Sequence, residues 1–379
     1  MIGERIRLVR EYLALTQQQL ADVAGVSQGA ISKAERGGPV ADKTVHAIAV
    51  ATDYNVSFFK RGPLPDVPEV SLRFRKHATS LRRDDKRFRA HFRQGVELVS
   101  DLERQAELPP VRLTPLFRDA TNENIEDLAV TVRQQLGVGR LDPIPNLTRA
   151  VERCGVVVCG TSVSLATHDA ASAWPNFPAG RPVISYTRGR SGDRQRLSIS
   201  HEIGHLLLHQ IGGVEPEYAE TQAFRFGTAL LIPQEATIEE LQPPVLLHRL
   251  AWVKSRWGIS IAALIRRGYD LGVFGRHRYG SLMKQLSARG WRREEPVTVP
   301  IEHPVLLPKT LRLVHGTDRP TAIASRTGFA PIVIRDLIGP TSASAERGRD
   351  RVVVEMHSSR EPDRMGGRTR KADPLGRTS

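Results

Sequence analysis

The segment 197–209 constrains this chain most, because it places two histidines and a glutamate in an apolar helical pattern. It reads Leu-Ser-Ile-Ser-His-Glu-Ile-Gly-His-Leu-Leu-Leu-His. His201 and His205 are four residues apart, so both lie on one face of a helix and both imidazoles can reach one metal ion. Glu202 directly follows the first histidine and can lean over the open side of the metal. A zinc hydrolase needs this arrangement, with a third protein ligand from elsewhere and a carboxylate that takes the proton of a bound water.

The third ligand is expected on the next helix. The glycine pair at 212–213 is predicted to end the first helix, because glycine tolerates the left-handed conformation that closes one. A second amphipathic stretch then runs from about 217 to 231 and stops at a proline. On it Glu220 shares a face with Ala223 and Gly227. Small residues let two helix backbones approach closely, so Glu220 is predicted to reach across to the metal.

Other assignments at this site stay open from the residues alone. Glu215 and Glu217 also lie near the first helix, but in or next to the turn and off the small-residue face. His209 lies one further turn along the face of the two histidines, where it can contact substrate, support a ligand or serve the core. Two histidines and a carboxylate suit Zn²⁺, although Mn²⁺ and Fe²⁺ accept the same ligands. A structural zinc site is disfavoured, because such sites close with four protein ligands and prefer cysteine.

The stretch from His201 to Pro233 resembles the ImmA/IrrE metallopeptidase family, in both the His-Glu-x-x-His helix and the Glu-x-x-Ala-x-x-Phe-x-x-x-Leu-Leu-Ile-Pro pattern that follows. The resemblance implies zinc ligands at His201, His205 and Glu220, and a general base at Glu202. The chain departs from the family at Phe224, where Asn is frequent, and at Gly227, where Ala is usual. Neither position is a ligand.

The overall charge indicates a polyanionic partner. The chain of 379 residues carries a formal net charge of +14 and has a pI near 10.3, which favours nucleic acid. The sequence has no apolar run of the roughly 18–20 residues that cross a bilayer. Its first residues are amphipathic and lack the apolar core of a signal peptide. We therefore expect a cytoplasmic, nucleoid-associated protein.

The first 60 residues carry a helix-turn-helix pattern. Thr16 with Gln19 three residues later forms a capping box, which predicts a helix start at Gln17. Gly25 suits the tight turn, and Ser27 caps the helix that follows. The segment through about residue 59 resembles the XRE (Cro/C1-type) family, which implies binding to a double-stranded DNA operator, with a symmetric homodimer as the usual arrangement.

The start of the recognition helix supplies the expected DNA contacts. A glutamine can pair bidentately with adenine, so Gln28 is the main candidate for base reading. Gln17, in the first turn of the preceding helix, is better placed for a phosphate. Gly29 offers no side chain, so specificity should rest on few direct contacts. The predicted DNA-binding residues are Gln17, Gln28, Gly29, Ser32 and Lys33.

A basic stretch follows the proline-rich linker at 61–68. Residues 73–93 hold nine Lys and Arg against two Asp, a net charge of +7. With Phe88 and Phe92 on one side, the pattern predicts a basic amphipathic helix running to about Leu108. It can extend the DNA footprint, since each neutralised phosphate adds salt-dependent affinity. It can also be a solvated helix that merely connects two domains.

The remaining pattern defines the expected fold class: a multidomain chain with an all-α helix-turn-helix domain, an α+β zincin-like metallopeptidase domain and a helical C-terminal extension. Strands are predicted near 155–159, 170–174 and 181–186, just before the active-site helix at 191–211. The expected boundaries are 1–62 for the helix-turn-helix, 63–115 for the linker and basic helix, 116–296 for the peptidase domain, 297–340 for a small helical piece and 341–379 for a disordered tail.

Two functions fit these features. The first is a DNA-binding regulator that carries its own zinc endopeptidase. The resemblance implies a narrow protein substrate, such as a repressor cleaved under stress or in mobile-element control, and the chain's own linker near 63–68 is another candidate. The second is a transcription factor whose peptidase fold serves as a sensor, ligand pocket or dimerisation unit without proteolysis. Glu202→Gln discriminates the two, because it removes the base and keeps the metal ligands.

Overall fold

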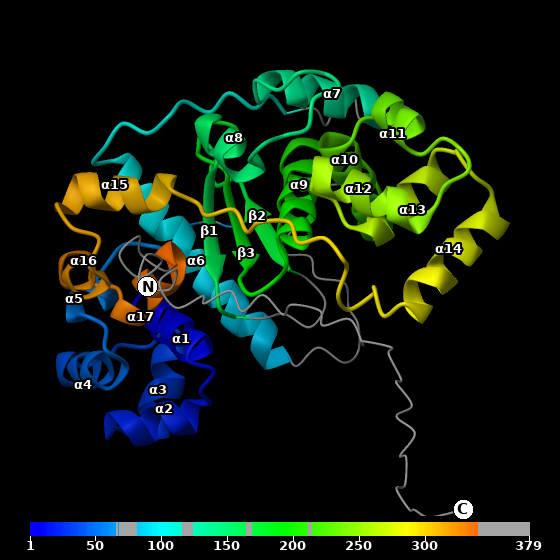
Figure 1. Ribbon diagram of the computed structural model, residues 1–379. Coiled ribbons are helices and arrows are strands. Elements are labelled where there is room, and N and C mark those ends of the chain that lie inside the picture. The colour runs from blue at the N-terminus through cyan, green and yellow to red at the C-terminus, as the bar shows by residue number, and fades with distance from the viewer. Residues whose placement is uncertain (66, 68–81, 116–123, 164–168, 211–213, 340–379) are drawn as a thin grey trace, which may run out of the picture. The chain divides into compact units, whose positions relative to one another are not determined.

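The computed structural model describes residues 1–65, 67, 82–115, 124–163, 169–210 and 214–339 (Figure 1). Met1–Gly339 pack as one unit. The predicted disordered tail, the glycine pair at 212–213 and residues 73–81 of the basic stretch lie outside the described residues. No helix in the described part of the chain is long and apolar enough to cross a membrane.

The N-terminal region is entirely helical and starts its helices where the capping residues predict. Thr16 accepts a hydrogen bond from the amide of Gln19, whose side chain accepts one from the Thr16 amide, which completes the capping box. Ser27 caps the next helix through the amide of Ala30. The five helices are α1 (Ile2–Tyr12), α2 (Gln17–Ala24), α3 (Gln28–Glu35), α4 (Asp42–Thr52) and α5 (Val56–Phe59).

A three-stranded mixed sheet forms the centre of the following region. Its strands are β1 (Val157–Thr161), β2 (Ala170–Ala173) and β3 (Val183–Thr187), in the order β1-β3-β2. β1 runs parallel to β3 and β2 antiparallel to it. All three predicted strands are present, although β1 lies two residues later than expected. Because every strand residue is buried, both faces of the sheet are covered.

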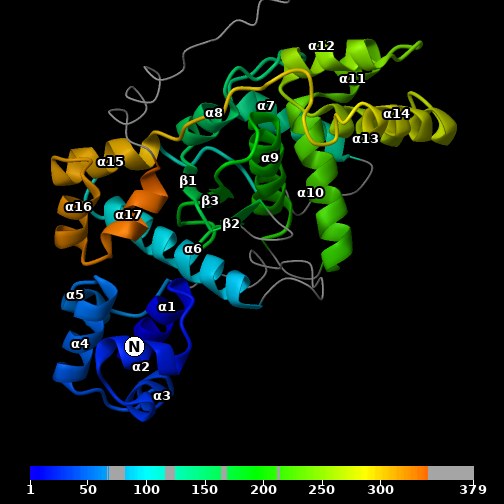
Figure 2. The ribbon, with the colours of Figure 1, turned by 60° about the horizontal axis from the view of Figure 1, so that its bottom comes forward.

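Helices surround the sheet: α9 packs against β2 and β3, and α10 lies beside α9 (Figures 1 and 2). The helices of this region are α7 (Ile125–Gln135), α8 (Leu147–Arg153), α9 (Gly192–Leu208), α10 (Pro216–Leu231), α11 (Gln234–Glu240), α12 (Leu247–Trp257), α13 (Ile261–Asp270) and α14 (Arg276–Ala288). The C-terminal stretch adds α15 (Leu306–His315), α16 (Pro320–Thr327) and α17 (Pro331–Ile338). These elements confirm the predicted fold class.

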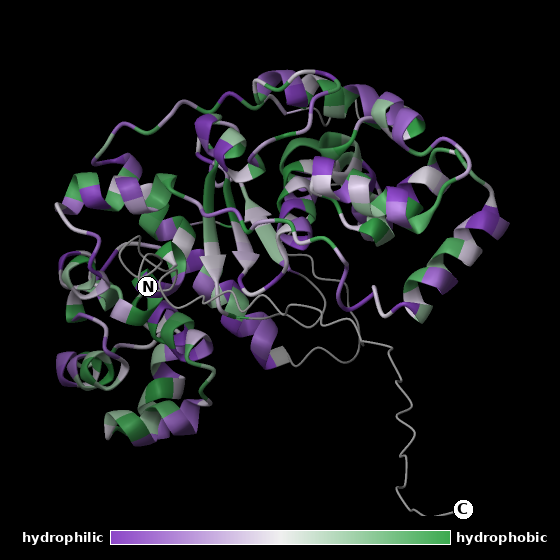
Figure 3. Ribbon diagram, viewed as in Figure 1, coloured by the Kyte–Doolittle hydropathy of each residue, from purple (hydrophilic) through white to green (hydrophobic). Residues whose placement is uncertain are grey.

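The sheet separates two hydrophobic cores, because successive strand residues point to opposite faces. Val158 and Ile184 point into a core shared with α7–α14. Cys159 and Val183 point into a second core, which contains the helix-turn-helix, α6 (Arg82–Glu103) and the C-terminal helices. Figure 3 shows polar and apolar residues on the same helices, as expected for helices with one face in a core. The helix-turn-helix core is therefore continuous with one face of the sheet.

Helix α6 is not a solvated connector, contrary to one reading of the sequence. Phe88 and Phe92 are fully buried, and so are nearly all residues from 90 to 99. The helix contacts α1, β1, α15 and α17. Its basic residues cluster in the first turns, where Arg83 donates a hydrogen bond to the carbonyl of Ala14. The apolar stripe of this helix thus outweighs its charge in determining where it lies.

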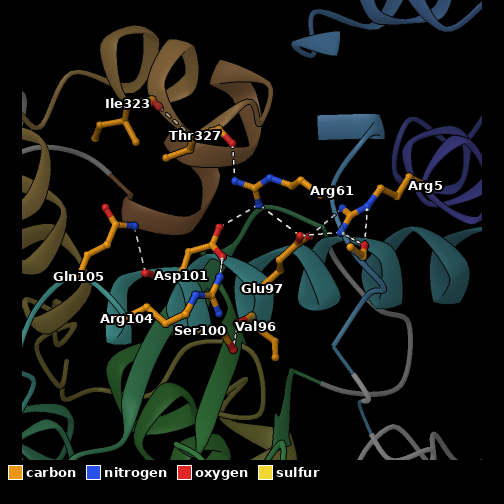
Figure 4. Close-up of polar contacts among 11 residues, drawn as sticks. Arg5, Arg61, Val96, Glu97, Ser100, Asp101, Arg104, Gln105, Ile323 and Thr327 are labelled. Atoms are coloured by element: carbon orange, nitrogen blue, oxygen red, sulfur yellow. Dashed lines mark hydrogen bonds and ion pairs between the residues drawn. The ribbon is translucent and has the colours of Figure 1, made fainter. Parts of the chain in front are cut away.

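A buried ion-pair network ties α1 and the segment after α5 to α6 (Figure 4). Arg5 makes a bidentate contact with the Glu97 carboxylate, at 2.8 and 3.1 Å. Arg61 reaches the same carboxylate at 3.2 Å and Asp101 at 2.8 Å. Arg61 also donates to the carbonyl of Thr327 at 2.6 Å. Glu97 is therefore shared by two cations that come from the N-terminal region.

We predict that Glu97→Gln lowers the free energy of unfolding by roughly 3 kcal/mol, because it leaves Arg5 buried without its counter-charge. The double variant Arg5→Met/Glu97→Leu should lose less than the sum of Arg5→Met and Glu97→Leu measured singly. Urea unfolding followed by circular dichroism measures all four variants. Strictly additive losses would show that the pair contributes no coupling.

Candidate metal centre and helix-turn-helix

Close packing of α9 against α10 brings the three predicted metal ligands together. A Cβ atom built on Gly204 would lie 3.1 Å from the Cα of Ala223, and one on Gly227 would lie 2.9 Å from the backbone nitrogen of His201. Larger residues at these two positions would push the helices apart. The small-residue face of α10 therefore lies directly against α9, on the turn that carries the first histidine.

His201, His205 and Glu220 converge on one point. The Nε2 atoms of the two histidines are 3.0 Å apart, and the Glu220 carboxylate oxygens lie 3.5 Å from the first and 3.4 Å from the second. Within the described residues, these three side chains place one ligand atom each within 4.8 Å of the others, close enough to hold one metal ion. Each of the three side chains is 16–19% exposed, so the cluster is recessed but open to solvent.

The donor set fits a divalent ion such as zinc. Ligands bound to tetrahedral Zn²⁺ at 2.0–2.2 Å lie about 3.4 Å from one another, close to the separations in this cluster. Two imidazole nitrogens and one carboxylate leave a fourth position free for water or substrate, as in catalytic rather than structural sites. Glu215 and Glu217, the alternative third ligands, are exposed and outside the cluster.

Glu202 is buried beside the cluster and is held by Ser172, a residue that is not predicted from the sequence. The Ser172 hydroxyl donates to Oε2 of Glu202 at 2.7 Å, and Ser172 is fully buried on β2. Burial raises the pKa of Glu202, although nearby His205 and the Ser172 hydrogen bond oppose the shift. The only local signal was a lone hydroxyl in an alanine strand, Ala-Ala-Ser-Ala.

The two histidines stabilise the negative charge of Glu220. Burial by itself would raise the pKa of Glu220, but hydrogen bonds from His201 and His205 outweigh it and hold this pKa below its ordinary range. Glu220 is thus an anion between two histidines. This is the charge state that a metal-binding carboxylate needs.

A second layer of polar side chains lies behind the histidines. Nδ1 of His205 contacts Nδ1 of His209 at 3.1 Å, and Nε2 of His209 contacts Oε1 of Gln222 at 3.0 Å. Burial lowers the pKa of His209 to about 4. The sequence leaves the role of His209 open, and no motif in it points to Gln222, which lies two residues after Glu220 on α10.

The helix-turn-helix presents its predicted DNA-binding residues on one exposed region. Gln28, Gly29 and Lys33 are exposed on α3, while Gln17 and Ser32 are half-buried. The Gln28 amide donates to the Gln17 carbonyl oxygen at 3.0 Å, and Gln17 in turn donates to Glu35 at 2.9 Å. A Cβ atom on Gly29 would meet nothing within 4 Å.

Comparison with known families matches both regions. A helix-turn-helix family model matches residues 6–59, and a model described as the IrrE N-terminal-like domain of the M78 peptidases matches residues 151–268. The search of curated proteins finds no match. The two family matches confirm the predicted combination of an XRE-type helix-turn-helix with an ImmA/IrrE-like metallopeptidase domain. The chain thus joins a DNA-binding module to a peptidase-family domain.

We predict that the purified chain binds one Zn²⁺ per molecule, and that Glu220→Ala or His205→Ala weakens binding by more than about 100-fold. Removing a ligand should cost more than the 10–100-fold that changes to supporting residues cause. Competition with a chromophoric chelator gives the dissociation constants. Glu215→Ala and Glu217→Ala are the matched controls and should bind like the wild type. If either control loses the ion instead, the third ligand is misassigned.

Proposed function

We propose that this protein is a DNA-binding transcriptional regulator with a zinc-dependent endopeptidase on the same chain. The observation that carries the proposal is the convergence of His201, His205 and Glu220, with Glu202 buried next to them and oriented by Ser172. Mn²⁺ or Fe²⁺ would fit the same donors. The substrate we propose is a specific protein, such as a repressor cleaved in a stress response or in mobile-element control.

The chemistry follows from what each side chain can do. When bound, a divalent ion acidifies a water molecule and polarises a carbonyl oxygen. Glu202 accepts the proton of the attacking water and passes it to the nitrogen of the leaving amine. Ser172 donates to one carboxylate oxygen of Glu202, which leaves the other oxygen for the water. Strand β2 is an edge strand of the sheet and lies next to α9. An extended peptide can pair with this edge as a further strand.

The chain's own linker is a second candidate substrate. It lies between α5 and α6, and its residues 66 and 68 fall outside the described residues. Cleavage there would not by itself free the helix-turn-helix, because Arg5 and Arg61 remain paired with Glu97 on α6. A separate repressor is therefore the substrate that the packing favours.

The DNA-binding half of the proposal rests on the paired glutamines. Gln17 accepts the hydrogen bond from Gln28 and so orients the Gln28 amide at the exposed start of α3. A glutamine held in this way can present its donor and acceptor together to an adenine edge. Lys33 and the basic start of α6 add charge for phosphates. We propose that a homodimer binds a two-fold operator.

A non-proteolytic regulator is the second candidate function, and one observation favours it. The core of the helix-turn-helix is continuous with the sheet face opposite α9. A ligand or metal bound at the cluster could thus alter the DNA-binding region through packed residues, without cleavage. The protein would then act as a sensor.

The central test of proteolysis compares new protein N-termini in cells that express the wild type, Glu202→Gln or Ser172→Ala, with and without DNA-damaging or oxidative stress. The new N-termini seen with the wild type should be absent with Glu202→Gln, because an amide cannot accept the proton of the attacking water. Ser172→Ala should reduce them by about tenfold, because general-base catalysis depends on a positioned carboxylate. Both variants should still bind zinc. Identical termini in all strains would reject the peptidase and favour the sensor.

The DNA-binding assignment predicts that Gln28→Ala weakens operator binding by about 1–3 kcal/mol, the usual loss for one bidentate base contact. The probe is a duplex that the wild type enriches from a random-sequence library, measured by fluorescence anisotropy. Gln285→Ala, which changes an exposed glutamine on α14, is the control and should bind normally. Unchanged affinity in Gln28→Ala would remove this residue from the contact set.

A further inference from the structure

Two buried side chains behind the metal cluster, His209 and Gln222, form a chain of hydrogen bonds that ends on His205. We infer that this relay fixes the tautomer of His205, and thereby sets the affinity of the cluster for metal. The inference rests on the metal site of the proposed function and is independent of whether the protein cleaves a substrate.

The relay lies in the interior of the protein and not on its surface. His209 directly follows the last residue of α9, four residues after His205, and Gln222 lies on α10. His209 is 4% exposed and Gln222 is 2% exposed. The contacts run from Nδ1 of His205 to Nδ1 of His209 at 3.1 Å, and from Nε2 of His209 to Oε1 of Gln222 at 3.0 Å.

When His205 binds a metal through Nε2, one placement of the ring protons satisfies every contact in this chain of hydrogen bonds. A histidine that binds a metal through Nε2 gives up the lone pair of that nitrogen, so its proton lies on Nδ1. Nδ1 of His205 then donates to Nδ1 of His209, which must be without a proton. The proton of His209 therefore lies on Nε2, where Oε1 of Gln222, which can only accept, receives it.

The opposite tautomer of His205 is disfavoured by the same contacts. It would place a proton on Nε2, which faces His201 at 3.0 Å and Glu220 at 3.4 Å, so no lone pair would point at the ion. It would also require His209 to donate through Nδ1 and leave its Nε2 facing an oxygen without a hydrogen between them. The carbonyl oxygen of Gln222 thus selects the metal-binding form.

The side-chain oxygen of Gln222 contacts Nε2 of His209. Its amide nitrogen is buried and has no hydrogen-bond partner in the described part of the chain. A glutamine kept only for packing would not need its oxygen directed at an imidazole. Residues that receive the second N–H of a metal-binding histidine usually raise metal affinity 10–100-fold, and here that function is performed through an intervening histidine.

The other roles open to His209 do not fit its position. At 4% exposure it is not accessible to a substrate. It contacts His205 at Nδ1, on the opposite side of the ring from the nitrogen that faces His201 and Glu220, so it does not complete the metal cluster as a fourth ligand. His209 is therefore a positioning residue for His205.

The test is the Zn²⁺ dissociation constant of the full-length chain, measured by chelator competition in apo proteins shown to be folded by circular dichroism. Gln222→Met removes the acceptor and should weaken binding 10–100-fold. Gln222→Glu supplies a stronger acceptor and should bind at least as tightly as the wild type, even though a buried carboxylate lowers stability. Gln210→Met is the matched control, because within the described residues Gln210 donates to the backbone carbonyl of His205 and has no hydrogen bond to its ring.

A second pair of variants keeps the test independent of Gln222. His209→Leu should weaken Zn²⁺ binding, and His209→Asn, whose side-chain oxygen can replace Nδ1 as acceptor, should recover most of it. The visible spectrum of the Co²⁺-loaded proteins should change in His209→Leu and not in His209→Asn.

The outcomes separate the relay from the metal site itself. A wild type that binds no Zn²⁺ would reject the site and the proposed peptidase together. A wild type that binds, with Gln222→Met and His209→Leu binding equally well, would overturn the relay alone. Equal losses in Gln222→Met and Gln210→Met would also overturn it, because the effect would then be general.

Discussion

The close approach of α9 and α10 is the interaction on which the site depends. Glycines at 204 and 227 let the two backbones come within the distance at which Glu220 faces both histidines. The same approach aligns Gln222 with His209. Side-chain chemistry alone would not assemble the cluster, because its donors come from two different helices. Helix packing therefore sets the geometry, and the polar contacts refine it.

The sheet couples this site to the rest of the chain. One face carries Ser172 toward Glu202 and shares the core of α7–α14. The other face packs on α6, which also contacts α1 of the helix-turn-helix. The helix-turn-helix and the peptidase-family domain are thus joined through one strand layer and one buried helix. The shared Glu97, held by Arg5 and Arg61, strengthens that junction.

The sequence predicts the parts of this structure that follow from short-range periodicity. The four-residue spacing of His201 and His205, the caps at Thr16 and Ser27 and the small face around Glu220 all act within one or two helical turns. Contacts between segments far apart in the sequence cannot be predicted from this periodicity. Ser172 meets Glu202 from a strand 30 residues earlier, and no local pattern distinguishes it from a polar residue of an edge strand. Helix α6 was ambiguous because its charges and its apolar stripe predict opposite environments.

The most direct measurement is a crystal structure of Glu202→Gln grown with Zn²⁺, with anomalous diffraction recorded at the zinc edge. The account predicts one strong peak within bonding distance of Nε2 of His201, Nε2 of His205 and a Glu220 oxygen, with the fourth position open toward solvent. A peak elsewhere in the chain, or a fourth protein ligand closing the site, would contradict a catalytic metal centre.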